Sequence, residues 1–202
     1  LTITKRTVTL KSADLDKKYD GNALENGNAP LAVEDGFVDG EGATYAFTGS
    51  QTLVGSSDNE FTYTLNEGTD AGNYTINTQF GKLKVTDREE GDKLKITVEA
   101  NSGSKTYDGK PLTVDGFKTQ SFEVEGNTYT VEGLTASATG TNVSDSKDVV
   151  VEGTAVVKDA AGNDVTAQFK VETKNGTLTI TKRTVTLKSA DLDKKYDGNA
   201  LE

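Results

Sequence analysis

The sequence contains no cysteine, no histidine, no methionine and no tryptophan. Without cysteine it has no disulfide, no thiolate nucleophile and no thiolate metal site. Without histidine it lacks the usual general base and the commonest imidazole ligand of metals. A catalytic centre would have to be built from Asp, Glu, Lys, Ser or Tyr alone. We therefore expect no enzymatic activity and no cofactor, and hence no catalytic, cofactor-binding or metal-ligating residue.

Positive charge and long apolar runs are also scarce. The 202 residues include 22 Lys and Arg against 32 Asp and Glu, which gives a net charge of -10 and a pI near 4.6. Nucleic acids and anionic membrane faces bind positive protein surfaces, so we expect neither as a partner. No apolar run is long enough to cross a bilayer, so we expect no membrane insertion. The absence of methionine predicts that the sequence is a piece of a longer protein.

The strongest feature that is present is an internal repeat. Residues 1–25, LTITKRTVTLKSADLDKKYDGNALE, recur without a single change as residues 178–202, which sets a period of 177 residues. Identity over this length cannot arise from shared propensity. The parent gene therefore carries a recently duplicated long unit.

A second, more diverged repeat lies inside this unit. The tripeptide Tyr-Asp-Gly occurs at 19–21, 107–109 and 196–198, at spacings of 88 and 89 residues. Its flanks also match, KKYDGNALE against KTYDGKPLT, and NYTINTQFGKLKVT (73–86) resembles QFKVETKNGTLTIT (168–181). Each unit is therefore expected to hold two homologous domains.

These matches set the expected domain boundaries. Residues 1–5 are the last strand of a preceding repeat, 6–87 form one domain (repeat A), 88–93 a short charged linker, 94–182 the second domain (repeat B), and 183–202 the first part of the next repeat A. The junction from repeat B to the next repeat A has almost no linker and is expected to be stiff. Residues 183–202 lack the rest of their domain, so they should fray or pair with an exposed edge of a neighbouring molecule.

Alternation of apolar and polar residues predicts β-strands along most of the chain. Segments with this period, rich in Val and Thr, are 59–65, 93–99, 121–133, 148–159, 168–173 and 177–181. No window has the spacing of an amphipathic helix, and the two prolines, Pro30 and Pro111, are expected beside strand or turn edges. Asn175-Gly176 predicts a two-residue hairpin of type I′, and residues 159–164 predict another turn.

The fold class expected from these elements is all-β. About seven short strands in each domain favour two tandem Ig-like antiparallel β-sandwich domains. A β-grasp-like fold is the alternative, but it requires a helix that the sequence does not indicate.

Three features invite interpretation as sites. Tyr-Asp-Gly combines a phenol with a carboxylate, but its recurrence favours a structural corner, with the ring at the core edge, the hydroxyl on backbone, and Asp-Gly in a tight turn. Residues 34–42, EDGFVDGEG, form an acidic turn cluster that could bind calcium, although the EF-hand spacing is absent. An intramolecular isopeptide bond between Lys and Asn or Asp is a further hypothesis, for which no recognised motif is present.

Four aromatic residues are candidates for stacking on sugar faces. They are Tyr45, Phe47, Tyr63 and Tyr129. Alternation along their strands predicts that most of them point into the core instead.

The repeated motifs resemble a known family. KKYDGNAL and KTYDGKPLT near the domain starts, each followed by a final segment of the type KVETKNGTLTITKRTVTL, resemble the YDG-type repeat domains, also called MBG-type, of large bacterial cell-surface adhesins. The resemblance covers nearly the whole chain and departs from the pattern at Asn22-Ala23, where repeat B has Lys110-Pro111.

This resemblance implies tandem domains that act as a stalk or spacer, outside the cell, and project a binding tip from the cell wall. It implies no catalytic residues. We accordingly expect a monomer whose partners are the neighbouring repeats of its own chain. The alternative function is a binding module for mucin glycans or a host matrix protein.

Overall fold

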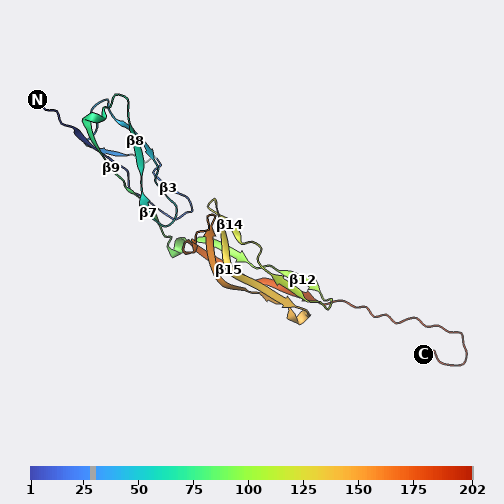
Figure 1. Cartoon of the computed structure of the whole chain (residues 1–202). Helices are drawn as coiled ribbons and strands as arrows, with labels where there is room; N and C mark the ends of the chain where they lie inside the picture. Colours follow the sequence, from blue (N-terminus) through green and yellow to red (C-terminus); the bar gives the residue numbers. More distant parts are fainter. Residues whose placement is uncertain (28–30, 202) are drawn as a thin grey trace. The chain divides into compact units, whose positions relative to one another are not determined.

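The computed structural model describes residues 1–27 and 31–201 (Figure 1); Pro30 lies outside them. Strands make up 51% of the chain and helical turns 6%. The described residues contain no α-helix, and their helical segments are short 3-10 turns: η1 (Ala71–Asn73), η2 (Glu90–Asp92), η3 (Val143–Asp145) and η4 (Thr166–Gln168). The expectation of an all-β fold is confirmed.

Repeat A contributes short strands that pair in small sheets. They are β1 (Arg6–Lys11), β2 (Leu15–Lys18), β3 (Leu24–Glu25), β4 (Ala32–Glu34), β5 (Ala43–Phe47), β6 (Ser50–Gln51), β7 (Gly55–Asp58), β8 (Phe61–Leu65), β9 (Tyr74–Gln79) and β10 (Lys82–Thr86). The sheet orders are β4-β1-β9, β2-β10-β7, β3-β6 and β5-β8. The first and last strands run parallel, with Arg6 of β1 opposite Tyr74 of β9 and Leu15 of β2 opposite Leu83 of β10.

Repeat B shows the same pairing pattern in most of its strands, except that no strand among the described residues takes the place of β4 beside β11. Its strands are β11 (Leu94–Glu99), β12 (Gly103–Thr106), β13 (Leu112–Asp115), β14 (Ser121–Val124), β15 (Asn127–Gly140), β16 (Lys147–Val149), β17 (Val151–Asp159), β18 (Phe169–Lys174) and β19 (Gly176–Thr181). The pair β11-β18 corresponds to β1-β9, and the three-stranded sheet β12-β19-β16 corresponds to β2-β10-β7. The pair β13-β15 corresponds to β3-β6, and β15-β17 corresponds to β5-β8. One long strand, β15, takes the place of both β5 and β6, and β14 lies beside it (Figure 1). The repetition in the sequence thus recurs in the strand pairing.

The chain forms two compact units whose limits do not follow the repeats. One unit holds Leu1–Val98, Thr119–Leu134 and Gly153–Thr173, and the other holds Glu99–Lys118, Thr135–Glu152 and Lys174–Glu202. Repeat A, the linker and part of repeat B therefore belong to the same unit. The domain boundaries expected from the sequence stay a prediction.

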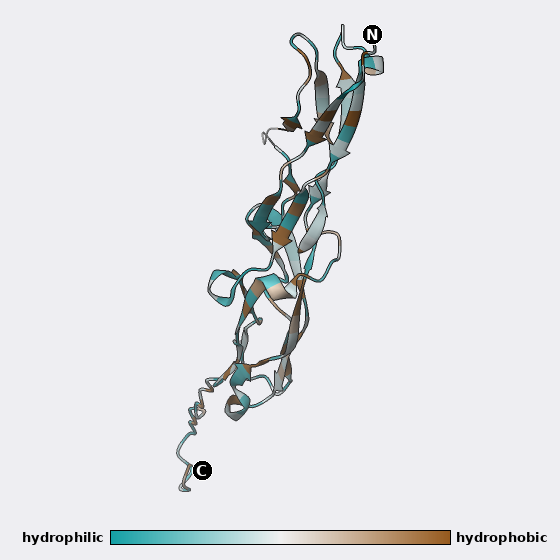
Figure 2. Ribbon diagram, turned by 90° about the vertical axis from the view of Figure 1, so that its left-hand side faces the viewer, coloured by the Kyte–Doolittle hydropathy of each residue, from teal (hydrophilic) through white to brown (hydrophobic). Residues whose placement is uncertain are grey.

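Each unit has its own hydrophobic core, built by alternation along the strands. In the first unit Val8, Leu10, Phe61 and Tyr74 are buried, and the Phe61 ring lies 5.9 Å from that of Phe47. The core of the second unit is made of Ala100, Val114, Ala136, Ala138, Val149, Leu178 and Ile180. Hydrophobic and hydrophilic residues accordingly alternate along the ribbon in Figure 2.

The hairpin predicted at Asn175-Gly176 is wrong. β18 ends one residue before Asn175 and β19 begins at Gly176, yet β18 pairs with β11 while β19 pairs with β12 and β16. Neither residue has a positive φ. Glycine is needed for space, because a Cβ at Gly176 would lie 1.9 Å from the carbonyl oxygen of Asn101. The turn predicted at 159–164 is confirmed: Asp159 N donates to Asn163 O at 3.1 Å.

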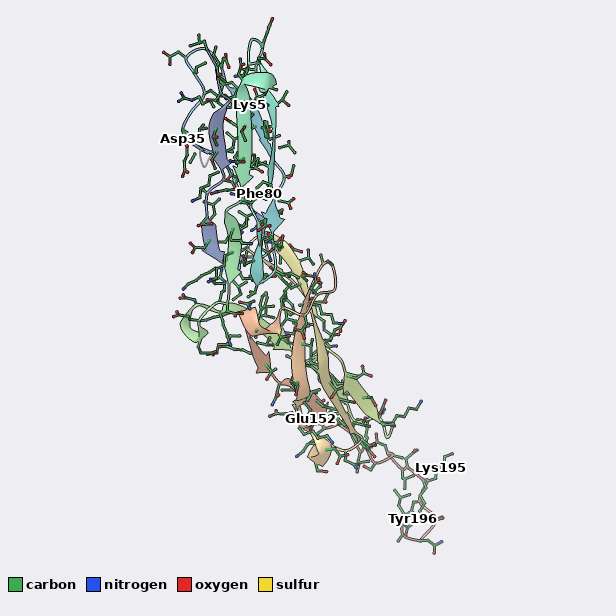
Figure 3. The ribbon with its side chains drawn as sticks, turned by 60° about the vertical axis from the view of Figure 1, so that its left-hand side comes forward. Lys5, Asp35, Phe80, Glu152, Lys195 and Tyr196 are labelled. Atoms are coloured by element: carbon green, nitrogen blue, oxygen red, sulfur yellow. The ribbon has the colours of Figure 1, made fainter. Side chains whose placement is uncertain are left out.

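The two copies of the identical 25-residue segment have different structures. Positions buried in one copy are exposed in the other. Leu178 and Ile180 are buried, whereas the equivalent Leu1 and Ile3 are exposed. Conversely, Val8 and Leu10 are buried, whereas the equivalent Val185 and Leu187 are exposed. Residues 183–201 form no strand, and Figure 3 shows Lys195 and Tyr196 on this tail. Burial of these positions therefore depends on the rest of a repeat and not on the local sequence.

Candidate functional site

The Tyr-Asp-Gly motif forms a turn that is closed by a lysine three residues before the aspartate. In repeat A, Asp20 Oδ1 accepts hydrogen bonds from Lys17 Nζ at 2.7 Å and from the backbone N of Asn22 at 2.9 Å. Lys17 Nζ also donates to the Asn22 carbonyl at 2.7 Å. Gly21 has a φ of 80°, a region that glycine reaches at no steric cost.

The same turn occurs at all three copies of the motif. In repeat B, Asp108 accepts hydrogen bonds from Lys105 Nζ and from the backbone N of Lys110. In the tail, Asp197 pairs with Lys194 and accepts a hydrogen bond from the backbone N of Asn199. The turn forms in the tail, where no strand supports it, so it is a local structure. The sequence pattern Lys-x-x-Asp-Gly could have revealed the lysine, which the interpretation of Tyr-Asp-Gly alone missed.

The three aspartates make this turn sensitive to acid. Hydrogen bonds from Lys105 and from the Lys110 backbone lower the pKa of Asp108 below its ordinary value of 3.8. At Asp20 burial opposes the shift, but the hydrogen bond from Lys17 lowers its pKa as well. The pKa of Asp197 is lowered by the Asn199 backbone and by Lys194.

We expect the chain to lose stability as the pH falls below about 4. A carboxyl whose pKa is lower in the folded state stabilises that state above its ordinary pKa, and this contribution disappears as the pH falls toward the folded value. The measurement is the melting temperature between about pH 6 and pH 2.5, compared with Asp108→Asn. The variant should show a weaker dependence on pH; identical profiles would contradict the assignment for Asp108.

The tyrosines of the three motifs lie in different surroundings. Tyr19 is 1% exposed, Tyr107 is 40% exposed and Tyr196 is 96% exposed. The Tyr19 hydroxyl lies 3.5 Å from the hydroxyl of Tyr129, a side-chain contact in place of the backbone contact that the sequence predicted. Burial, and the hydrogen bond with Tyr129, raise the pKa of Tyr19. A phenolate that could act as a base is thus disfavoured at this motif.

Arg88 of the linker connects repeat A to loops of repeat B inside the first compact unit. Its Nε donates to the carbonyl of Tyr19 at 2.6 Å, and its Nη2 pairs with Glu125 at 3.2 Å. Its backbone N donates to Gln168 Oε1 at 2.9 Å, and Gln168 Nε2 donates to Asp87 Oδ1 at 2.6 Å. The linker is therefore held by specific hydrogen bonds. Nothing in the sequence singled out Arg88 or the buried Gln168.

The acidic cluster at 34–42 is organised by an arginine. Arg6 Nε donates to the carbonyls of Asp35 and Gly36 at 3.0 and 2.8 Å, and the Val38 backbone N donates to the Tyr74 hydroxyl at 3.2 Å. Figure 3 shows Lys5 and Asp35 at the same end of repeat A. In the part of the chain that the structure describes, no three acidic side chains come together as a metal site would require. The carboxylates of this cluster are thus not assembled around one point.

Most of the candidate sugar-stacking aromatics belong to cores. Tyr129 is buried with its ring 4.7 Å from that of Phe169, and Tyr45 and Phe47 pack against the core that contains Phe61. The prediction that most of them point inward is confirmed. Tyr63 is 37% exposed and is the member of the group that a ligand could reach.

Among the described residues, no helix has the length and apolar character that a membrane span requires. Comparison with protein-family models, with curated proteins and with solved structures found no match.

Proposed function

We propose that the chain is a structural stalk or spacer made of YDG-type repeats, on the outside of a bacterial cell, where it projects a binding tip away from the cell wall. The finer fold that we propose is a pair of tandem Ig-like sandwiches. The protein works as a monomer without catalysis, and its partners are the neighbouring repeats of its own chain.

The observation that carries this proposal is the repetition of the sequence together with its strand pairing. Residues 178–202 repeat residues 1–25 without a change, and the pairs β1-β9 and β2-β10 of repeat A have the counterparts β11-β18 and β12-β19 in repeat B. Homologous repeats in tandem, each in contact with its neighbours, form an extended array. The hydrogen bonds of Arg88 support a defined junction between successive repeats.

We expect the maximum dimension to grow nearly in proportion to the number of units. The one-unit chain of 202 residues is compared with a two-unit chain, made by appending residues 26–202 after Glu202; the join keeps the native sequence because 178–202 repeat 1–25. Small-angle X-ray scattering gives the dimension of each chain. A two-unit particle hardly longer than the one-unit particle would contradict a stalk.

The second candidate function is a binding module for mucin glycans or a matrix protein, and the exposure of Tyr63 favours it. Aromatic side chains that are both exposed and rigid bind sugar faces and protein partners at low entropic cost. Binding of the chain to a panel of mucin glycans and matrix proteins tests this function. Saturable binding that is lost in Tyr63→Ala would support the binding module. Absence of binding to every member of the panel would contradict it and leave the stalk as the proposed function.

A further inference from the structure

The first and last strands of repeat A lie side by side in parallel and keep one register. Arg6 of β1 is opposite Tyr74 of β9, and Lys18 of β2 is opposite Thr86 of β10. The partners are equally far apart in the sequence at both places, so the register does not shift between β1 and β2. We call β1 and β2 on one side, with β9 and β10 on the other, the terminal strand pair. It belongs entirely to the first compact unit.

Backbone hydrogen bonds continue between and beyond these strands. Where β1 passes into β2, Ser12 N donates to Gln79 O at 3.1 Å. After β2, Tyr19 N donates to Thr86 O at 3.0 Å. Buried side chains on the terminal strand pair exclude the water that would compete for such bonds. These side chains are Val8, Leu10, Leu83 and Val85.

Two side chains add further bonds across the terminal strand pair. At the start of β10, Lys82 N donates to Asp14 Oδ1 at 2.7 Å. At the end of β10, Thr86 Oγ1 donates to Lys17 O at 3.2 Å. Both bonds join the same two stretches of chain as the backbone bonds do, so they oppose the same displacement.

Repeat B has the same bonds in its own parallel pair, β12 with β19, inside the second compact unit. Tyr107 N donates to Thr181 O at 2.9 Å, and Thr181 Oγ1 donates to Lys105 O at 3.4 Å. At the start of β19, Thr177 N donates to Ser102 Oγ at 3.0 Å. The acceptor at this end is a hydroxyl here and a carboxylate in repeat A, yet the bond is present in both repeats.

Tension along a stalk acts on the terminal strand pair in one particular direction. The chain enters repeat A at the start of β1 and leaves it at the end of β10. Because the strands are parallel, a pull at these two points draws them in opposite directions along their common axis. The strands then have to slide past each other, and all the bonds between them carry the load at once. A pull on two adjacent strand ends breaks the bonds one after another instead.

We propose that the terminal strand pair is a mechanical clamp, which keeps the repeat folded when the stalk is under tension. The proposal rests on the proposed stalk function and assigns the load within a repeat to named strands. The other strands of repeat A lie outside this line of load, so they contribute to stability at rest more than to resistance under force. The resistance of the repeat therefore depends on the direction of the force.

The test is forced unfolding of repeat A in two directions. The sequence contains no cysteine, so two introduced cysteines fix the points of attachment in optical tweezers. Lys5→Cys with Glu89→Cys loads the terminal strand pair in shear, whereas Lys5→Cys with Asn73→Cys pulls apart the adjacent starts of β1 and β9. We expect unfolding at equal force to be at least about tenfold slower in shear, which corresponds to about 1.4 kcal/mol of barrier. All three side chains are exposed, so both variants should melt at the temperature of the unchanged chain.

Thr86→Val separates the clamp from ordinary stability. The variant loses the bond from the Thr86 hydroxyl to Lys17 O, at the end of the terminal strand pair that is remote from Lys5 and Asn73. In shear this bond carries load from the beginning, so unfolding should become about fivefold faster, the effect of about 1 kcal/mol. When the chain is pulled at Lys5 and Asn73 the bond breaks late, and the rate should hardly change. Thr64→Val on β8, outside the terminal strand pair, is the matched control and should leave both rates unchanged.

Equal unfolding rates in the two directions, or an equal effect of Thr86→Val in both, would overturn the clamp. The scattering measurement is independent of these rates. If the two-unit particle is longer in proportion but the two directions are equivalent, the stalk stands without a clamp. If the particle is folded back, the stalk itself is contradicted, and with it the load that the clamp is proposed to carry.

Discussion

Tyr19→Ala should lower the free energy of unfolding by about 3–5 kcal/mol, whereas Tyr196→Ala should leave it unchanged. Tyr19 is fully buried and its hydroxyl lies beside that of Tyr129, so truncation to Ala leaves a cavity and removes this contact. Tyr196 is surrounded by the same sequence but has no packing to lose. Urea denaturation of the three chains, followed by circular dichroism, measures the difference.

Tyr196 is a close control, because it lies in a segment identical to the one that contains Tyr19. Any effect on the local turn or on the unfolded chain is the same for both substitutions. Tyr19→Phe separates the ring from the hydroxyl and should cost about 1 kcal/mol or less, since the hydroxyl contact at 3.5 Å is long. Equal losses for Tyr19→Ala and Tyr196→Ala would show that Tyr19 acts only through its turn.

Local features of this fold could be predicted from the sequence. Period-two alternation located β11, β18 and β19, and the glycine after the aspartate marked a turn that forms even in the tail. These features depend on residues within a few positions of one another. Pattern and propensity therefore suffice for them. The strand predicted over 121–133 is wrong as one element, because a turn with positive φ at Glu125 and Gly126 divides it into β14 and the first half of β15.

Features that depend on distant partners could not be predicted. Tyr19, Tyr107 and Tyr196 share a motif, but what packs against them decides whether they are buried. Arg88 gave no signal, because its partners Tyr19 and Glu125 are far away in the sequence. Asn175-Gly176 has the composition of a hairpin, but the pairing of the strands on either side of it overrides that preference.

The two repeats also differ inside, where their sequences gave no indication. Ser12 and Asn59 are buried in repeat A: Ser12 Oγ donates to the Asn59 carbonyl at 2.6 Å, and Asn59 Nδ2 donates to Ala13 O at 2.9 Å. Ser12 N donates to Gln79 O at the end of β9, and Ala100 N donates to Lys174 O at the end of β18. The position of Ser12 is therefore occupied in repeat B by the apolar, buried Ala100. Repeat A thus relies on a buried polar network at a place where repeat B relies on apolar packing, and such networks destabilise strongly when one partner is removed.

Gly176→Ala should destabilise the chain by about 3 kcal/mol or more, while Gly91→Ala should have almost no effect. The added Cβ at Gly176 would lie 1.9 Å from Asn101 O and 2.9 Å from Ala100 O, both of them backbone atoms that cannot turn aside. The segment 100–101, which joins β11 to β12, would have to move away from the start of β19, and the buried side chains of Leu178 and Ile180 would move with that strand. Gly91 has no atom within 4 Å of its Cβ position and no positive φ, so it accepts the methyl group.

Chemical denaturation with hydrogen exchange measures both the size and the place of this effect. Protection should fall first in the second compact unit, at the amides of β12 and β19, because the displaced segment leads into β12 and Gly176 is the first residue of β19. Gly81 has the same role in repeat A, where a Cβ would lie 2.3 Å from Ala13 O, so Gly81→Ala should produce a matching loss in the first unit. If Gly176→Ala were as stable as Gly91→Ala, the close approach of residues 100–101 to the start of β19 would not be what requires glycine at this position.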